Sequence, residues 1–382
     1  MLRSSIQPRS HSTPGAAAAR ALESTDGRTE VIGWDMAYAR LIAGRGAASS
    51  ERKLAIPILR FAAVLSAYVT SVAILVAGNI YLTVAAVPVA GILIVMLFVI
   101  GHDACHQSFT RSRWVNNVIG RIAFLPALHA YSLWEHEHNR RHHGFNNIRN
   151  LDYAWIPLSP REFRNAGVID RLKYRVYRDP GGVLLYYLIE IWPRRKIIPR
   201  NKFLGRVRAV HWVDSALVLS FLAVCLTILA VAGPRFGKSV AEVWLVGALL
   251  PFLIFSALFS AAIYLHHTHY DVPWYDSIEQ WKKGNGSVLG TVHVEFPWIV
   301  RVASFNIMEH NAHHLAPTIP HYHLAAAQKD AIVEGVVVWK FTMRGYFDVC
   351  ARCKLFDYES ARWLDFHEQP TGGKPAMATH SH

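Results

Sequence analysis

Four long apolar segments restrict the folds open to this 382-residue chain. They span residues 61–77, 80–100, 213–232 and 243–265, and almost no charged residue interrupts them. A helix needs about 20 apolar residues to cross roughly 30 Å of hydrocarbon, and each segment approaches that length. Only a short turn separates the two segments of each pair. We therefore predict an all-α integral membrane protein whose four transmembrane helices form two hairpins.

The basic residues predict which side of the membrane each loop occupies. The two turns between paired helices hold only Arg235 and Lys238, whereas residues 40–53 and 111–208 are rich in arginine and lysine. Because Lys and Arg concentrate in cytoplasmic loops, we place both termini and the central segment on the cytosolic side. Much of the net charge of +13 then faces an anionic lipid leaflet.

Outside these four segments, the chain divides into three regions. Residues 1–52 contain no apolar stretch long enough for a secretory signal, so we predict a flexible arm, with an organelle transit peptide as the alternative. Residues 53–366 form the predicted membrane domain, and residues 367–382 form a flexible tail. Within the domain, residues 115–133 and 181–192 are apolar but interrupted or short, which favours interfacial or re-entrant helices over membrane spans.

The 21 histidines are clustered rather than evenly spread. The clusters follow the second and fourth apolar segments or lie in cytosolic regions that can fold beneath both hairpins. Their members are His102 and His106; His136, His138, His142 and His143; His266, His267 and His269; and His310, His313 and His314. Residues three or four apart share one face of a helix, close enough to bind one metal ion. Each cluster alone also fits a helix cap or a polar interfacial helix, but their common depth predicts a metal site.

The number of histidines indicates the kind of site. Imidazole is a ligand for zinc, copper, iron and nickel. Eight or nine imidazoles are too many for one tetrahedral zinc ion and fit two metal ions. A neutral imidazole needs a partner on its second ring nitrogen. Asp103, Glu135 and Glu309 lie in or beside the clusters and are candidates for that role, although each also fits an ordinary surface position.

The histidine boxes resemble those of a known family. HDACH from His102, HNRRHHGFNNIRNLDYAW from His138 and HNAHH from His310 are similar to the boxes of membrane fatty acid desaturases, which hold a di-iron centre. Three further stretches are most similar to the Δ12 (omega-6) acyl-lipid desaturases of bacteria and plastids: YLHHTHYD from Tyr264, GSVLGTVHVEFPWIVRVASFNIMEHNAHHLAPTIPHYHL from Gly286, and CKLFDYESARWLDF from Cys353. The resemblance covers residues 55–366 and implies a cytosolic helical cap that holds a di-iron site.

The resemblance also implies which histidines bind the irons. Eight histidines of the three boxes are ligands in this family, and here those positions are His102, His106, His138, His142, His143, His310, His313 and His314. A ninth ligand follows the fourth transmembrane helix; we expect His267, with His269 as the alternative. Many Δ12 relatives have one residue fewer between the positions of His138 and His142. This departure makes His136 the alternative to His138.

The same resemblance implies an oxidoreductase that uses two iron ions (Fe2+/Fe3+) and O2 to introduce a cis double bond into a long-chain acyl group. The expected substrate is a monounsaturated acyl-lipid, desaturated at the Δ12 or omega-6 position, with acyl-CoA and an acyl carrier as alternatives. We expect a separate electron donor, either ferredoxin or a cytochrome b5-like protein. Membrane lipids are expected partners and nucleic acid is not. The expected location is a bacterial inner membrane rather than a plastid or endoplasmic reticulum membrane.

Other functions remain open at this point. A related di-iron membrane hydroxylase, acetylenase or carotenoid ketolase would use the same boxes. A membrane metal carrier or sensor would place His, Asp or Glu at mid-membrane, and the centres of the four segments carry none. For a desaturase, selectivity among nearly identical methylenes must come from the shape of the acyl path. Gly91 and Ala257 either line this path or pack helices together.

Overall fold

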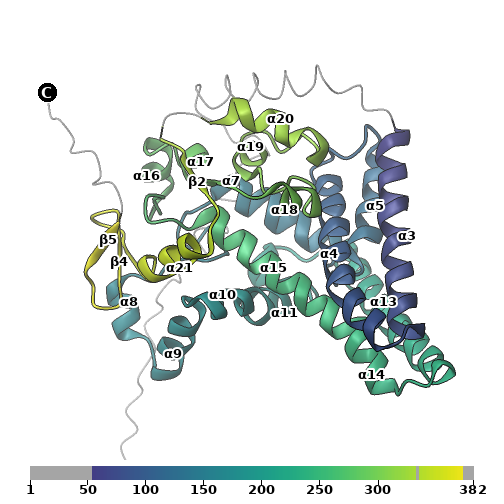
Figure 1. Ribbon diagram of the computed structural model, residues 1–382. Coiled ribbons are helices and arrows are strands. Elements are labelled where there is room, and N and C mark those ends of the chain that lie inside the picture. Colours follow the sequence, from purple (N-terminus) through teal and green to yellow (C-terminus); the bar gives the residue numbers. More distant parts are fainter. Residues whose placement is uncertain (1–53, 333–334, 373–382) are drawn as a thin grey trace, which may run out of the picture.

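The computed structural model describes residues 54–332 and 335–372. The predicted N-terminal arm at residues 1–52 lies outside these residues, and so do residues 373–382 of the predicted tail. The described elements run from α3 to β5 and are mostly helices (Figure 1). The predicted all-α class is therefore confirmed, with two small sheets added.

Four helical stretches are long and apolar enough to cross a membrane, and they match the four predicted segments. The first hairpin consists of α3 (Ala55–Ala77) and α4 (Ile80–Cys105). The second consists of α13 (Ala209–Ala232), the 3-10 turn η3 (Gly233–Phe236), α14 (Val240–Trp244), the π-helical η4 (Leu245–Leu249) and α15 (Leu250–His267). The side chain of Asn79 accepts a hydrogen bond from Leu82 N (3.0 Å) and so caps the start of α4.

The inner helices of this bundle are α4 and α15, which pack against each other. Half of the apolar part of α4 is buried, against 17% in α3 and in the α13 span. A Cβ at Gly91 would lie only 2.6 Å from Ile254 Cγ2, so Gly91 packs α4 against α15. Both inner helices continue past the predicted ends of their spans, to Cys105 and His267. These additional turns carry histidines of two clusters.

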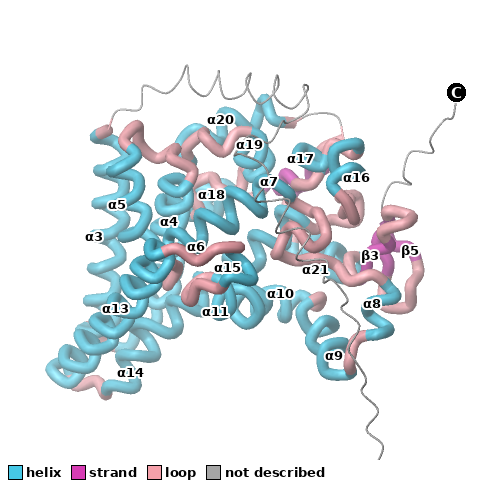
Figure 2. Tube along the Cα trace, turned by 180° about the vertical axis from the view of Figure 1, so that it is seen from behind, coloured by secondary structure: helices cyan, strands magenta, loops and turns pink. Residues whose placement is uncertain are grey.

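A cap of short elements is formed by residues 106–208, between the hairpins, and by the described residues after His267. Figures 1 and 2 show several helices of its second part at the end of the hairpins opposite the turn between α13 and α14. The first part contains α5 (Arg113–Phe124), α6 (Tyr131–Glu135), η1 (His136–His142), α7 (His143–Phe145), α8 (Pro160–Asn165), α9 (Val168–Tyr177), α10 (Pro180–Tyr186), η2 (Tyr187–Ile191), α11 (Trp192–Arg195) and α12 (Asn201–Leu204). The second part contains α16 (Ile278–Lys283), α17 (Gly286–Leu289), α18 (Trp298–Ala303), α19 (His310–Leu315), α20 (His321–Ala331) and α21 (Met343–Arg352).

The two segments predicted as interfacial fold into short helices, too short to span a membrane. Residues 115–133 fall mainly in α5 and α6, and residues 181–192 in α10 and η2. The Tyr187 backbone N–H donates to Ser260 Oγ (3.2 Å), which ties η2 to α15. Leu185 and Ile189 remain exposed on the outer side, as expected for helices beside a membrane.

Two small sheets complete the cap. β1 (Val292–Glu295) pairs in parallel with β2 (Val337–Lys340), and Val292 lies opposite Val337. β3 (Leu355–Asp357), β4 (Arg362–Leu364) and β5 (Pro370–Gly372) form an antiparallel sheet. β5 continues this sheet past the predicted domain boundary at residue 366. Strands of three or four residues are too short for their alternation to be recognised in a sequence.

Candidate metal centre

The nine histidines predicted as ligands lie together where α4 and α15 end in the cap. They come from α4 and the residue after it, from η1 and α7, from α15 and from α19. Their ring nitrogens form two separate groups, one of five histidines and one of four. Segments that are far apart in the sequence thus supply each group.

Group one contains His102, His106, His138, His143 and His313, and one ring nitrogen of each lies within 4.8 Å of the others. The Nε2 atoms of His102 and His138 are 2.9 Å apart, and those of His138 and His143 are 3.2 Å apart. The His143 and His313 Nε2 atoms are 2.9 Å apart. The group therefore joins α4, η1, α7 and α19 around one point.

Group two contains His142, His267, His310 and His314, again with ring nitrogens within 4.8 Å of one another. The Nε2 atoms of His267 and His310 are 2.9 Å apart. The alternative ninth ligand, His269, belongs to neither group in the described structure. Its Nδ1 accepts a hydrogen bond from the Asp271 backbone N–H (3.2 Å).

The π-helical turn η1 distributes the second histidine cluster over both groups. The His143 backbone N–H donates to the carbonyl oxygen of His138, five residues earlier, where an α-helix would use the carbonyl four residues earlier. His138 and His143 thereby both enter group one, while His142 enters group two. The additional residue of this box is taken up by the π turn. Of the two alternatives, the structure brings His138 into a group and leaves His136 outside both.

The buried state of these rings fits metal binding. Among these rings, burial lowers the pKa well below the usual range for His106, His138, His143, His310, His313 and His314. These imidazoles are therefore neutral at neutral pH and carry a free lone pair. In the described structure, His106 Nε2 and His314 Nε2 are buried without a hydrogen-bond partner. Such burial costs free energy unless the atom finds a partner, so the donor set fits two imidazole-bound metal ions.

Three rings have partners on the nitrogen that points away from their group. His142 Nδ1 lies 3.1 and 3.3 Å from the two Asp152 carboxylate oxygens. His267 Nδ1 lies 3.1 Å from the Gly290 carbonyl oxygen, and His102 Nδ1 lies 3.4 Å from Asp103 Oδ1. Partners of this kind set the tautomer and the orientation of a metal-binding imidazole.

Of the three candidate carboxylates, only Asp103 contacts a ring of either group within the part of the chain that is described. Its Oδ2 accepts hydrogen bonds from His321 N and Nδ1, both at 2.7 Å. Glu135 is partly buried near the charges of Arg121 and Arg140, and burial raises its pKa. Glu309 lies elsewhere, beside a cavity.

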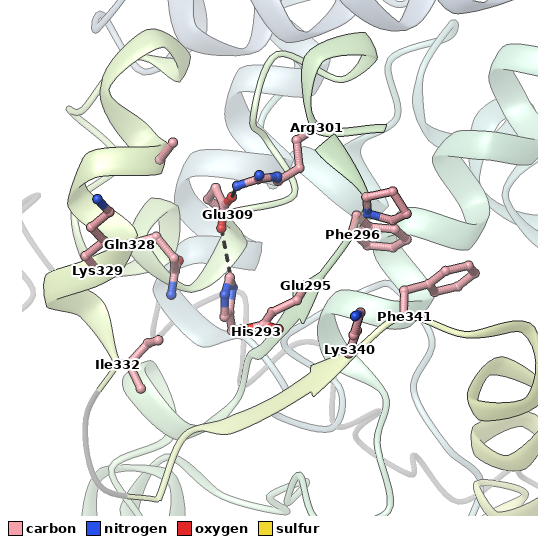
Figure 3. A pocket seen from close by; sticks show the side chains of 12 residues that line it. His293, Glu295, Phe296, Arg301, Glu309, Gln328, Lys329, Ile332, Lys340 and Phe341 are labelled. Carbon is pink, nitrogen blue, oxygen red and sulfur yellow. Dashed lines mark ion pairs between the residues drawn. The ribbon is translucent and has the colours of Figure 1, made fainter. Parts of the chain in front are cut away.

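That cavity has a volume of about 610 Å³, and one of the residues that line it, Glu309, directly precedes His310 of group two (Figure 3). The Glu309 carboxylate lies 3.5 Å from His293 Nδ1 and 3.5 Å from Arg301 Nη1. Lys329 and Lys340 also line the cavity. Glu309 thus acts as a counter-charge for Arg301 at the cavity wall.

Two partners that orient histidines were not identified from the sequence: the Asp152 carboxylate and the Gly290 carbonyl. Asp152 stands ten residues after His142, in the NLDYAW stretch of the second box. The position of Asp152 after the box is a signal that could have pointed to it. The Gly290 carbonyl is a backbone atom and leaves no signal in a sequence, because its role depends only on how the chain folds beside α15.

Comparisons with known proteins identify the family of the chain. The model of the family "Fatty acid desaturase" matches residues 78–340. The "sn-1 oleoyl-lipid 12-desaturase" of Arthrospira platensis is 32% identical over 232 residues, 59% of this chain and 62% of the relative. The protein of the same name from a Picosynechococcus species is 29% identical over 266 residues, 69% of this chain and 73% of the relative.

A plant relative is also similar. The "Omega-6 fatty acid desaturase, chloroplastic" of Arabidopsis thaliana is 29% identical over 239 residues, which cover 63% of this chain and 51% of the relative. The chain therefore spans 62% of the Arthrospira relative and about half of the Arabidopsis relative. The family match covers most of the chain. It includes three of the four membrane helices, all but α3, and both histidine groups. On this evidence the chain is a membrane protein of the fatty acid desaturase family, which confirms the resemblance of its histidine boxes.

Proposed function

We propose that this protein is an O2-dependent fatty acid desaturase that introduces a cis double bond into a long-chain acyl group, at the Δ12 or omega-6 position of a monounsaturated acyl-lipid. One observation carries the proposal: two groups of clustered, mostly buried imidazoles lie at the ends of the two inner membrane helices. The names of the relatives support the position of the double bond and the lipid substrate.

Each group would hold one iron ion, the first by His102, His106, His138, His143 and His313, and the second by His142, His267, His310 and His314. When bound, the two irons supply the reduction of O2 and the removal of hydrogen from unactivated methylenes. Overall, one CH2–CH2 unit, O2, two electrons and two protons give one CH=CH unit and two waters.

The residues of the chain contribute orientation and exclusion of water. Asp152 and Asp103 accept hydrogen bonds from His142 and His102 and so hold these rings in one tautomer. Because most of these rings are buried, few water molecules reach the donor nitrogens. Precise placement of the rings relative to the acyl chain lowers the entropic part of the barrier.

The electrons would come from a separate carrier, ferredoxin or a cytochrome b5-like protein, on the cytosolic side of a bacterial inner membrane. The net charge of +13 favours an acidic carrier. Electrostatic steering of that carrier weakens as salt increases, because the Debye length falls to about 8 Å at physiological ionic strength.

The decisive experiment is expression in a host that makes monounsaturated acyl chains, together with an electron donor. Gas chromatography–mass spectrometry of the lipids is expected to show a diene with methylene-interrupted double bonds. His313→Ala and His314→Ala are expected to lose both the diene and the iron, whereas His367→Ala, at an exposed position, keeps both. Hydroxylated or unchanged acyl chains from an iron-loaded protein would overturn desaturation in favour of a hydroxylase or another related oxidation.

A further inference from the structure

A fully buried ion pair joins the π turn to the residue that follows α11. Lys196 follows α11 and has a side-chain exposure of 0%, and Glu137 lies within η1 with an exposure of 1%. Lys196 Nζ lies 2.7 Å from Glu137 Oε2, and Arg195 Nη1 lies 2.6 Å from Glu137 Oε1. Burying such a pair costs more than packing apolar side chains of similar size in the same place. Stability alone therefore does not account for it.

One side of the pair contacts the support of group one. Glu137 directly precedes His138 in η1. The Trp134 ring stacks on the His138 ring with centroids 4.7 Å apart and planes at 24°. Lys196 Nζ lies 4.7 Å from the centroid of the Trp134 ring. The pair therefore reaches His138 both along the backbone and through a stacked indole.

The other side of the pair contacts the support of group two. Lys196 Nζ lies 4.5 Å from the centroid of the Tyr153 ring, and Arg195 Cζ lies 5.2 Å from it. The Tyr153 backbone N–H donates to Asp152 Oδ1 (2.7 Å), and Asp152 holds His142 of group two. One buried cation thus touches the supports of both histidine groups.

A π turn is rare and needs support from its surroundings, because its backbone bonds skip one residue more than in an α-helix. We propose that Glu137 and Lys196 are positioning residues of the metal centre. Their ion pair holds the π turn so that His138 enters group one and His142 enters group two. This inference rests on the proposed two-metal centre. It explains how the histidines of the π turn are divided between the two groups.

The test uses the full-length protein in detergent and measures metal, not desaturation. In the double variant Glu137→Met with Lys196→Met, no charge of this pair is left buried, and Arg195, which is partly exposed, can reach water. We expect the double variant to fold, as judged by circular dichroism and its melting curve. We also expect it to retain at most one of two irons per chain and to bind Co2+, the spectroscopic probe, at least about 10-fold more weakly.

A matched control removes the ion pair between Glu190 of η2 and Arg194 of α11. Arg194 and Glu190 form a pair that is more exposed, so Arg194→Gln with Glu190→Gln is expected to keep two irons and the native Co2+ spectrum. The single variants Glu137→Gln and Lys196→Met are expected to be less stable than the double variant, because each leaves one buried charge without its partner.

Three outcomes separate the alternatives. If the double variant keeps both irons and the native Co2+ spectrum, the pair is only structural and the proposal is overturned. Failure of the double variant to fold would also overturn it, since the pair would then be required for the fold itself. If the native protein binds two irons but makes no diene, the proposed function fails while the positioning role stands.

Discussion

The hydrogen-bond partner of an imidazole decides how firmly the orientation and tautomer of that ring are fixed. Asp152 is fixed before any metal binds, because its carboxylate accepts hydrogen bonds from the backbone N–H groups of Asn147 (3.0 Å) and Tyr153 (2.7 Å). The same carboxylate lies 3.1 Å from His142 Nδ1. It therefore presents His142 Nε2 to group two in a single tautomer.

Replacing this carboxylate is expected to weaken the second metal site. Asp152→Asn keeps the shape of the side chain but removes its charge and one acceptor oxygen, so metal affinity should fall by about 10- to 100-fold. A Co2+ titration followed by absorption spectroscopy measures this change. Asp170→Asn, at an exposed position of α9, is the control and should bind Co2+ like the native protein. Equal affinities of the two variants would show that Asp152 does not orient His142.

Two alternatives at the residue scale could not be decided by spacing. Spacing rules assume an α-helix, in which residues four apart share one face. The π turn breaks this rule after His136, and it is a response to tertiary contacts rather than to local composition. The sequence also left the choice between His267 and His269 open, because it does not show that α15 ends between them. The ligand roles of the nine histidines stay a prediction until metal is measured.

Close packing of α4 on α15 is the main feature at the scale of elements. A Cβ at Gly91 would lie 2.6 Å from Ile254 Cγ2 and 2.8 Å from Ile254 Cβ. The two helices that carry histidines at their ends therefore depend on a glycine for their separation. A change in that separation moves His102 relative to His267.

Gly91→Ala is expected to destabilise the bundle. Overpacking a tight contact typically costs about 1–3 kcal/mol, so the thermal midpoint in detergent should fall. Gly181→Ala is the matched control, since a Cβ there would meet no atom within 4 Å. If Gly91→Ala melted no lower than Gly181→Ala, the close approach would be unimportant for stability.

The elements differ in how well the sequence predicts them. The four membrane helices follow from length and hydropathy, because a backbone in hydrocarbon must satisfy all its hydrogen bonds within a helix or a closed barrel. The cap elements do not follow, since most are shorter than ten residues and their apolar patterns are too brief. Their positions depend on contacts with the hairpins, such as that of Tyr187 with Ser260.

At the scale of the whole molecule, the two histidine groups connect both hairpins and both parts of the cap. Metal bound at these groups would add a further link between these elements. A ligand that binds only the folded state stabilises it by about 2.7 kcal/mol at 100 times its dissociation constant.

Removing iron with a chelator is therefore expected to lower the thermal midpoint of the protein, and adding Fe2+ back should restore it. Differential scanning fluorimetry in detergent measures both steps. The His313→Ala variant is the control, and we expect its midpoint to change little with either treatment. An unchanged midpoint in the native protein would contradict a metal link between the hairpins.

The distribution of charge predicts the orientation of the whole molecule. Arg235→Cys, in the turn between the helices of the second hairpin, should react with a membrane-impermeant maleimide from outside intact bacterial cells. Arg161→Cys, at an exposed position in α8 of the cap, should react only after permeabilisation. The unsubstituted chain is the control, as Cys105, Cys350 and Cys353 are buried and Cys225 is partly buried. The reverse labelling pattern would invert the proposed topology.

The sequence by itself determined the four membrane helices, their pairing into hairpins and the histidine boxes. These properties are local: a long apolar run has few solutions in lipid, and a histidine box is a short stretch of chain. Only the tertiary structure decided how nine histidines divide into two groups, that a π turn separates His138 from His142, and that Asp152 and the Gly290 carbonyl orient the rings. The physical reason is that these features arise from contacts between segments far apart in the chain, which no local pattern encodes.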